Sequence, residues 1–205
     1  MLLTGLISFI FYPSLYITLG NYIKVSTLMS RVPKITICYN KSMRIIKHKS
    51  ITWIDITNPT KKDIEFIGKK DRIHPIILDE LLHTSARSKV ELHPKYLFLT
   101  YHLPIFDNTV KTSRRTEIDF LITKEKIITV HYEELEPLNN FWRHISNDPR
   151  FKDRVMSEGT GQMLYYSIEE ILTFSQRQMK HIEDKISNVT SELFQGRENQ
   201  LLAKI

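Results

Sequence analysis

The residues best suited to chemistry in this 205-residue chain are two adjacent carboxylates, Asp79 and Glu80. They follow a short apolar run, residues 76–78, which comes directly after a His-Pro step. Carboxylate oxygens are the ligands that a hard cation such as Mg²⁺ prefers. The residues alone allow two interpretations. Either the pair forms part of a cation site, or the two acids are solvated on a helix surface near basic neighbours.

Other kinds of site leave weaker signals. The sequence contains no Gly-x-Ser-x-Gly nucleophile motif and no phosphate-binding loop, so we do not expect an enzyme. Cys38 is the only cysteine; this excludes an intramolecular disulfide and a cysteine-rich metal site, and it favours a reducing compartment. His74 is expected to begin a helix. His102 and His131 fall on predicted strands, apart from any carboxylate pair, where packing or edge roles are expected.

The composition is that of a soluble globular protein, with 41% hydrophobic and 25% charged residues. The length suits one domain with an appendage. A net charge of +6 could indicate a nucleic-acid partner. The basic residues are scattered over different predicted elements, however, so no nucleic-acid partner is predicted.

The first 23 residues contain no charged side chain and are long enough for a transmembrane candidate. Pro13 interrupts the segment, and no basic region precedes it, so a signal peptide fits poorly. If the segment inserts, the cations that follow it keep the next domain cytoplasmic. The alternative is a poorly ordered leader upstream of a natural start at Met29. Both alternatives stay open for residues 1–33.

Residues 34–150 predict an α/β domain. Strand patterns occupy residues 35–39, 43–46, 52–56, 90–92, 96–103, 117–123 and 127–131. Thr60 is expected to cap one helix with Asp63 in its first turn, and Pro75 to occupy the first position of a second. A third helix is predicted over residues 137–145. Strands with helices before and after them predict a mixed sheet covered on both faces, an α/β/α arrangement.

Residues 151–195 predict a long packing helix in a C-terminal antiparallel helical segment. Apolar positions recur at alternating spacings of three and four, which is typical of a helix packed along another helix. They are Ile168, Leu172, Ser175, Met179, Ile182, Ile186, Val189 and Leu193. Gly196 is expected to end this helix, and residues 196–205 to bend into the start of another. The apolar stripe must be covered by another chain or by sequence not present here.

A set of short motifs resembles, in order and spacing, the cytoplasmic domain of the CorA family of magnesium transporters. The motifs are Trp53-Ile54-Asp55, Asn58-Pro59-Thr60, His74 to Leu82, Arg87 to Glu91, Tyr96 to Leu99, Glu117 to Phe120 and Thr129-Val130-His131. The resemblance covers about residue 34 to the C-terminus. It supports the α/β/α fold expected from the residue pattern.

The resemblance implies a homopentameric Mg²⁺ channel of the inner membrane, with cytoplasmic domains that form a funnel. In that family, a stalk helix leads to two transmembrane helices joined by a Gly-Met-Asn loop. This sequence contains no Gly-Met-Asn, so we expect the sensor portion of such a transporter, without the stalk and pore. The alternative is a stand-alone interaction or metal-binding module that has lost transport.

The resemblance also implies site residues. Asp79 and Glu80 occupy the positions of an acidic pair that faces a neighbouring subunit, although their order is Asp-Glu instead of Glu-Asp. A second family ligand lies in the long helix, where this chain has Thr173-Phe174; Glu169 and Glu170, one turn earlier, are the fallback candidates. The implied ion is Mg²⁺, with Co²⁺, Ni²⁺ or Zn²⁺ in related branches.

Overall fold

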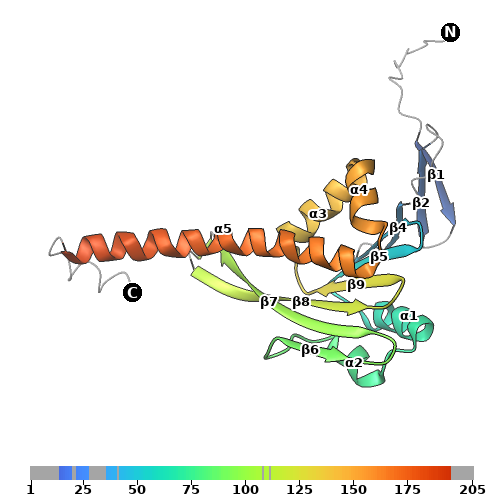
Figure 1. Ribbon diagram of the computed structural model, residues 1–205, viewed down its shortest axis with the longest axis horizontal. Helices are drawn as coiled ribbons and strands as arrows, with labels where there is room; N and C mark the ends of the chain where they lie inside the picture. Colours follow the sequence, from blue (N-terminus) through green and yellow to red (C-terminus); the bar gives the residue numbers. More distant parts are fainter. Residues whose placement is uncertain are drawn as a thin grey trace, which may run out of the picture.

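A single mixed sheet organises the chain in the computed structural model, which describes residues 14–19, 22–27, 36–40, 42–107, 109–110 and 112–194. The described strands follow the order β1-β2-β3-β4-β5-β9-β8-β7-β6 (Figure 1). Their bounds are β1 Ser14–Leu19, β2 Tyr22–Thr27, β3 Thr36–Asn40, β4 Met43–His48, β5 Ile51–Thr57, β6 Lys89–Leu92, β7 Leu97–Asp107, β8 Thr112–Ile122 and β9 Lys126–His131. Strands β5 and β9 pair in parallel, and the other neighbours are antiparallel.

Helices cover both faces of the sheet, as predicted. Helices α1 (Lys61–Asp71) and α2 (Pro75–Glu80) lie on one face. On the other lie α3 (Glu136–Asn147), α4 (Pro149–Met156) and α5 (Thr160–Phe194), the longest helix in Figure 1. The sequence-based α/β/α fold with a long C-terminal helix is therefore confirmed. A separate short helix, α4, spans the domain boundary predicted at residue 150, and the long helix begins at Thr160.

Strand alternation divides the core into two layers. On β5, Trp53 faces the α3 side, where its ring lies 5.3 Å from that of Phe141. The next residue, Ile54, faces the opposite side and packs in the layer that contains Ile64 and Ile67 of α1. Successive strand residues point to opposite faces, so one strand supplies both layers.

The start of α1 and a close helix–helix contact set the position of α2. Thr60 and Asp63 form a reciprocal capping box: the Asp63 amide donates to the Thr60 hydroxyl, and the Thr60 amide donates to the Asp63 carboxylate. Gly68 of α1 lies against Leu78 of α2 so closely that an added Cβ would be 2.4 Å from the Leu78 Cδ1 atom. The missing side chain lets the two helices approach.

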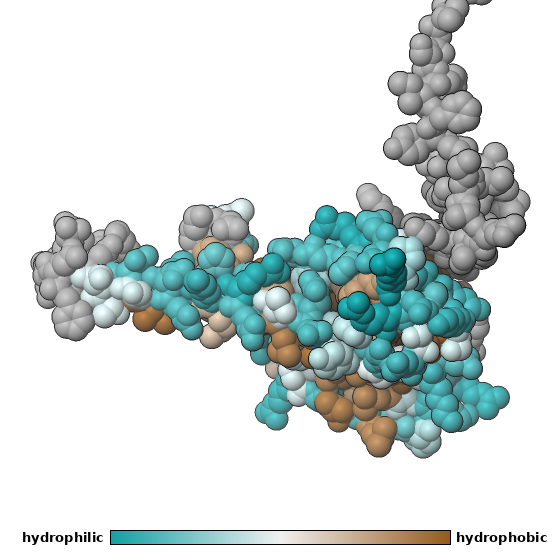
Figure 2. All heavy atoms as spheres, turned by 45° about the horizontal axis from the view of Figure 1, so that its top comes forward, coloured by the Kyte–Doolittle hydropathy of each residue, from teal (hydrophilic) through white to brown (hydrophobic). Residues whose placement is uncertain are grey.

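Helix α5 is packed along only part of its length. Met163, Ile171 and Phe174 are buried against the sheet and α3. Figure 1 shows the C-terminal half of α5 extending beyond the sheet. Apolar side chains of the predicted stripe remain exposed along it, among hydrophilic residues in Figure 2; they are Leu172, Met179, Ile186, Val189 and Leu193.

The predictions for the two ends of the chain fall only partly on described residues. Within the predicted leader, 1–33, strands β1 and β2 pair with each other, and β2 pairs with β3. The predicted helix end at Gly196 and the helix start after it are not among the described residues. Among the described helices, none combines the length and apolar character needed to cross a bilayer.

Candidate metal site

The adjacent acids Asp79 and Glu80 lie at the C-terminal end of α2, as predicted. The helix begins at His74, whose side chain accepts a hydrogen bond from the Ile76 amide, and Pro75 takes the first position. The Asp79 side chain is exposed, and its carboxylate has no hydrogen bond or ion pair within the described part of the chain. This carboxylate is therefore open to a ligand.

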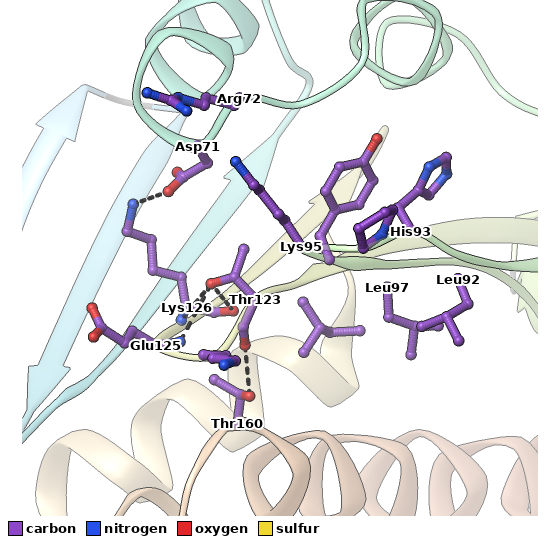
Figure 3. Close-up of a pocket in the computed structure, with 14 residues that line it drawn as sticks. Asp71, Arg72, Leu92, His93, Lys95, Leu97, Thr123, Glu125, Lys126 and Thr160 are labelled. Atoms are coloured by element: carbon purple, nitrogen blue, oxygen red, sulfur yellow. Dashed lines mark hydrogen bonds and ion pairs between the residues drawn. The ribbon is translucent and has the colours of Figure 1, made fainter.

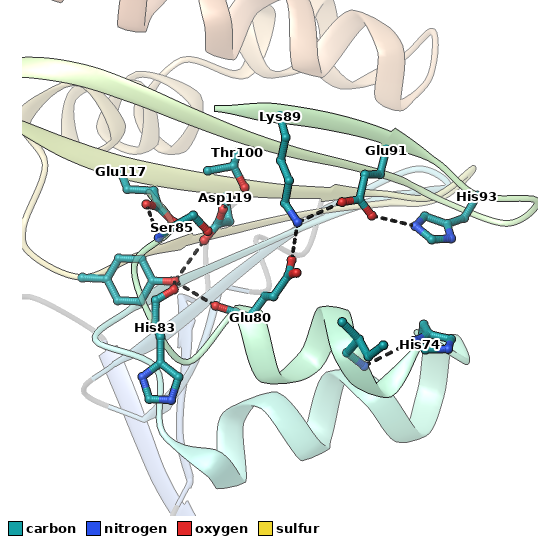
Figure 4. Close-up of polar contacts among 12 residues, drawn as sticks. His74, Glu80, His83, Ser85, Lys89, Glu91, His93, Thr100, Glu117 and Asp119 are labelled. Carbon is teal, nitrogen blue, oxygen red and sulfur yellow. Dashed lines mark hydrogen bonds and ion pairs between the residues drawn. The ribbon is translucent and has the colours of Figure 1, made fainter. Parts of the chain in front are cut away.

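Glu80, by contrast, already has a cationic partner. Lys89 of β6 donates to the carboxylates of Glu80 at 2.6 Å and Glu91 at 2.8 Å, and Figure 4 shows its ammonium group between them. Burial alone would lower the pKa of Lys89, but the bonds to both carboxylates raise it. The bond from Lys89 lowers the pKa of Glu91. A metal ion at Glu80 must therefore displace Lys89 or share the carboxylate with it.

The fallback acids, Glu169 and Glu170, do not join this pair within one chain. They lie on α5, which packs on the sheet face opposite α2. Over the residues that the structure describes, no group of three or more His, Cys, Asp or Glu side chains could hold a metal ion. Mg²⁺ binds few protein carboxylates and keeps several waters. Asp79 and Glu80 therefore fit part of a Mg²⁺ site whose other ligands come from elsewhere.

A basic pocket that sequence reasoning missed lies at the end of α1 (Figure 3). It has a volume of about 720 Å³ and includes Arg72, Lys95 and Lys124, which have no ion-pair partner among the described residues. Lys126, also in the pocket, pairs with Asp71. These unpaired cations make the pocket unsuited to a divalent cation.

A buried acidic cluster lies behind the exposed pair, on the α2 side of the sheet. Glu117 and Asp119 of β8 are 2% and 1% exposed. In the antiparallel register, Glu117 lies opposite His102 and Asp119 opposite Thr100. The Glu117 Oε2 atom lies 3.0 Å from His102 Nε2, and Asp119 Oδ1 accepts from the Thr100 hydroxyl at 2.7 Å.

The burial of these acids shifts pKa values within the cluster. Burial is the main cause that raises the pKa of Asp119 to about 7, and the charge of Glu117 raises it further, against the bond from Thr100. Burial, followed by the charge of Asp119, raises the pKa of Tyr132 above its ordinary value. Asp119 therefore changes its protonation near neutral pH.

A second buried carboxylate, Asp55, lies on the α3 side of the sheet. Arg44 Nε donates to it at 2.7 Å, and Thr129 also donates to it. The imidazole of His131 lies 3.3 Å from Asp55 Oδ1. The expectation that His102 lies apart from any carboxylate pair is wrong, because it contacts Glu117, which lies beside Asp119 on β8. His131 contacts the single carboxylate Asp55 and is buried, in line with the expected packing role.

Sequence reasoning gave no functional role to Glu117 and Asp119, although a signal was present. Two acids at positions i and i+2 of an apolar strand point to the same face, and acids are rarely buried without partners. The residues that lie opposite these acids depend on the strand register. The alternating pattern alone does not say which strand, or which residue of it, pairs with each acid.

Structure comparison first defines the class: the fold is that of the CorA soluble domain and of the ZntB cytoplasmic domain. The soluble domain of CorA from Methanocaldococcus jannaschii aligns with a TM-score of 0.59 at 24% identity, over 71% of this chain and 56% of that chain. The ZntB cytoplasmic domain from Vibrio parahaemolyticus aligns with a TM-score of 0.53 at 13% identity, over 83% of this chain and 66% of that chain.

The sequence then gives the family. The model of the CorA-like Mg²⁺ transporter protein family matches residues 48–205, so the chain belongs to this family, as the motifs predicted. It is 24% identical to the cobalt/magnesium transport protein CorA of M. jannaschii over 76% of this chain and 47% of that protein. It is 21% identical to the CorA of Thermotoga maritima over 75% of this chain and 43% of that protein. The chain thus spans about half the length of these relatives, which are named as transport proteins.

Proposed function

We propose that this chain is the metal-sensing cytoplasmic part of a CorA-like transporter of Mg²⁺. The observation that carries the proposal is the open carboxylate of Asp79 beside Glu80, at the surface end of α2 in a domain of this family. Two carboxylates supply hard oxygen ligands but too few for a closed site.

The proposed mechanism joins subunits through the ion. Exposed acids on neighbouring subunits repel one another, and Mg²⁺ between them removes this repulsion. Binding then favours the arrangement in which the subunits lie close together, which we propose corresponds to a closed pore. Because a metal ion shifts only an equilibrium in which it binds one state better, the open state must separate these carboxylates.

The alternative is a stand-alone metal-binding or interaction module without transport. The gene sequence beyond residue 205 distinguishes the two, because two hydrophobic spans joined by Gly-Met-Asn identify a transporter.

Limited proteolysis with and without millimolar Mg²⁺ tests the sensor proposal. We expect Mg²⁺ to slow digestion of the chain, and the double substitution Asp79→Ala with Glu80→Ala to remove this protection. A matched control replaces Glu183 and Asp184, an adjacent pair of exposed acids on α5, with alanine and should keep it. Equal digestion rates with Mg²⁺ and with Na⁺ at the same ionic strength would contradict the proposal.

A further inference from the structure

The Tyr132 hydroxyl lies among three oxygen atoms but has only one hydrogen to donate. It is 2.9 Å from the carbonyl of His83, 3.0 Å from Asp119 Oδ2 and 3.4 Å from the carbonyl of Glu80. A phenol donates once and can also accept. If Asp119 is protonated, it can donate to the Tyr132 oxygen, and the Tyr132 hydrogen is then free for the His83 carbonyl. A proton on Asp119 therefore completes this set of contacts.

The charge of Glu117 also favours a proton on Asp119. Glu117 and Asp119 are two residues apart on β8, so their side chains lie on the same face of the sheet, and two ionised carboxylates contain no hydrogen-bond donor. Glu117 Oε1 is buried and has no hydrogen-bond partner among the described residues. Two carboxylates that share a site do not both ionise readily, because their charges repel. One shared proton removes the repulsion and supplies the missing donor.

The same cluster holds the segment that connects α2 to β6, residues 81–88. The Ser85 amide donates to Glu117 Oε2 at 2.7 Å, and the Ser85 carbonyl lies 3.1 Å from His102 Nε2. The His83 carbonyl accepts from Tyr132. These contacts fix the backbone that directly follows Glu80, so they also fix the end of α2.

We propose that Glu117 and Asp119 share one proton and form a pH-sensitive latch, which holds residues 81–88 against the sheet and so positions Asp79 and Glu80. Glu117 and Asp119 are positioning residues in this arrangement and do not contact the metal ion. The latch stands on its own contacts; its effect on metal binding rests on the proposed function.

The surroundings of the pair set the direction of the pH effect. The charged and titratable groups around it are His102 from β7, Tyr132 after β9, and Arg115 of β8, which donates to the Ala86 carbonyl. Glu80 of α2 is paired with Lys89 of β6 (Figure 4). None of these places a fixed cation on Asp119. With its pKa raised from 3.8 to about 7, the closed latch holds a proton that the open segment loses, so closure weakens as pH rises through 7.

Hydrogen exchange of residues 81–88 tests the latch in the chain without metal. After correction for the intrinsic pH dependence of exchange, we expect about tenfold more opening at pH 8 than at pH 6, by proton linkage for a pKa near 7. Asp119→Asn should remove this difference, because the amide keeps a donor and has no charge to gain. Asp153→Asn, the same change on the opposite face, should keep it. Equal corrected exchange at both pH values in the unsubstituted chain would overturn the proposal.

Infrared spectroscopy supplies a test that does not depend on a variant's folding. The unsubstituted chain at pH 6 should show the carbonyl band of a protonated buried carboxyl group, which disappears as the pH rises to 8. The absence of this band at pH 6 would overturn the proposal.

Tyr132→Phe, which removes the contact to His83, should increase exchange of residues 81–88 at pH 6.

Metal titration then separates the latch from the sensor. If the latch and the sensor both hold, the protection from proteolysis that Mg²⁺ gives weakens from pH 6 to pH 8 in the unsubstituted chain. In Asp119→Asn, this protection becomes independent of pH. If Mg²⁺ gives no protection at any pH while exchange still varies with pH, the sensor fails and the latch stands. If protection occurs and exchange does not vary with pH, the latch fails and the sensor stands.

Discussion

At the scale of single residues, Asp55 shows how this sheet keeps a buried carboxylate ionised. Burial alone would raise the pKa of Asp55, but His131, Arg44 and Thr129 together lower it. Asp55 therefore contributes stability that is present above its ordinary pKa and is lost as the pH falls through the lower folded value. Burial alone would also lower the pKa of His131, and Asp55 raises it. The stability that His131 contributes is complete below pH 6.5 and is lost as the pH rises through the pKa of His131 in the folded chain.

Removal of one partner of Asp55 should be costly. Arg44→Met leaves the buried carboxylate without its fixed cation, and we expect the free energy of unfolding to fall by about 3 kcal/mol, the range for a broken buried ion pair. Urea unfolding measures this loss. Lys47→Met changes an exposed cation on the same strand and should cost less than about 0.5 kcal/mol. Similar losses in the two variants would show that Arg44 does not stabilise Asp55.

At the scale of elements, α5 has two apolar faces, of which one is buried and the other is exposed. The face formed by Met163, Ile171 and Phe174 packs on the sheet, whereas Ile186 is 61% exposed and Met179 is 49% exposed. The same spacing of three and four describes both faces. Periodicity therefore predicted a long C-terminal helix correctly, but the predicted stripe largely follows the exposed face of that helix and not the face that packs.

A matched pair of substitutions on α5 tests this division. Ile171→Ala removes a side chain that is 1% exposed, and we expect it to lower the free energy of unfolding by about 2–5 kcal/mol through loss of burial and a residual cavity. Ile186→Ala should change it by less than about 0.5 kcal/mol. Thermal or urea unfolding at low protein concentration measures both. A large loss for Ile186→Ala under these conditions would mean that the outer half of α5 is covered.

At the scale of the whole molecule, the sheet separates the candidate metal ligands. Asp79 and Glu80 lie on the α2 side, while Glu169 and Glu170 lie on the helix that covers the other side. One chain therefore offers an incomplete set of ligands, and a complete site needs a second chain or sequence beyond the described part.

Metal binding and self-association should accordingly be linked. A ligand that binds only the assembled form favours assembly, so Mg²⁺ should shift the chain to larger species in sedimentation velocity. The midpoint Mg²⁺ concentration should fall as the protein concentration rises. Glu169→Gln with Glu170→Gln tests whether α5 acids take part: an unchanged midpoint excludes them. A midpoint that does not depend on protein concentration would contradict a site between subunits.

The sequence by itself determined the local elements and the family. Local signals suffice for these features, since strand alternation, the Thr60–Asp63 capping box and the His74-Pro75 helix start depend on neighbouring residues. The ordered motifs predicted the family that the match over residues 48–205 confirms. They also placed Asp79 and Glu80 correctly at the end of α2.

Only the tertiary structure decided what these acids contact. Register across β7 and β8 brings Glu117 opposite His102, and the parallel pairing of β5 with β9 brings Asp55 to Thr129. Such contacts join residues far apart in the chain, and no local pattern specifies them. The pair Asp79–Glu80 was visible in the sequence, but its partner Lys89 and the protonated cluster behind it follow from strand pairing and burial.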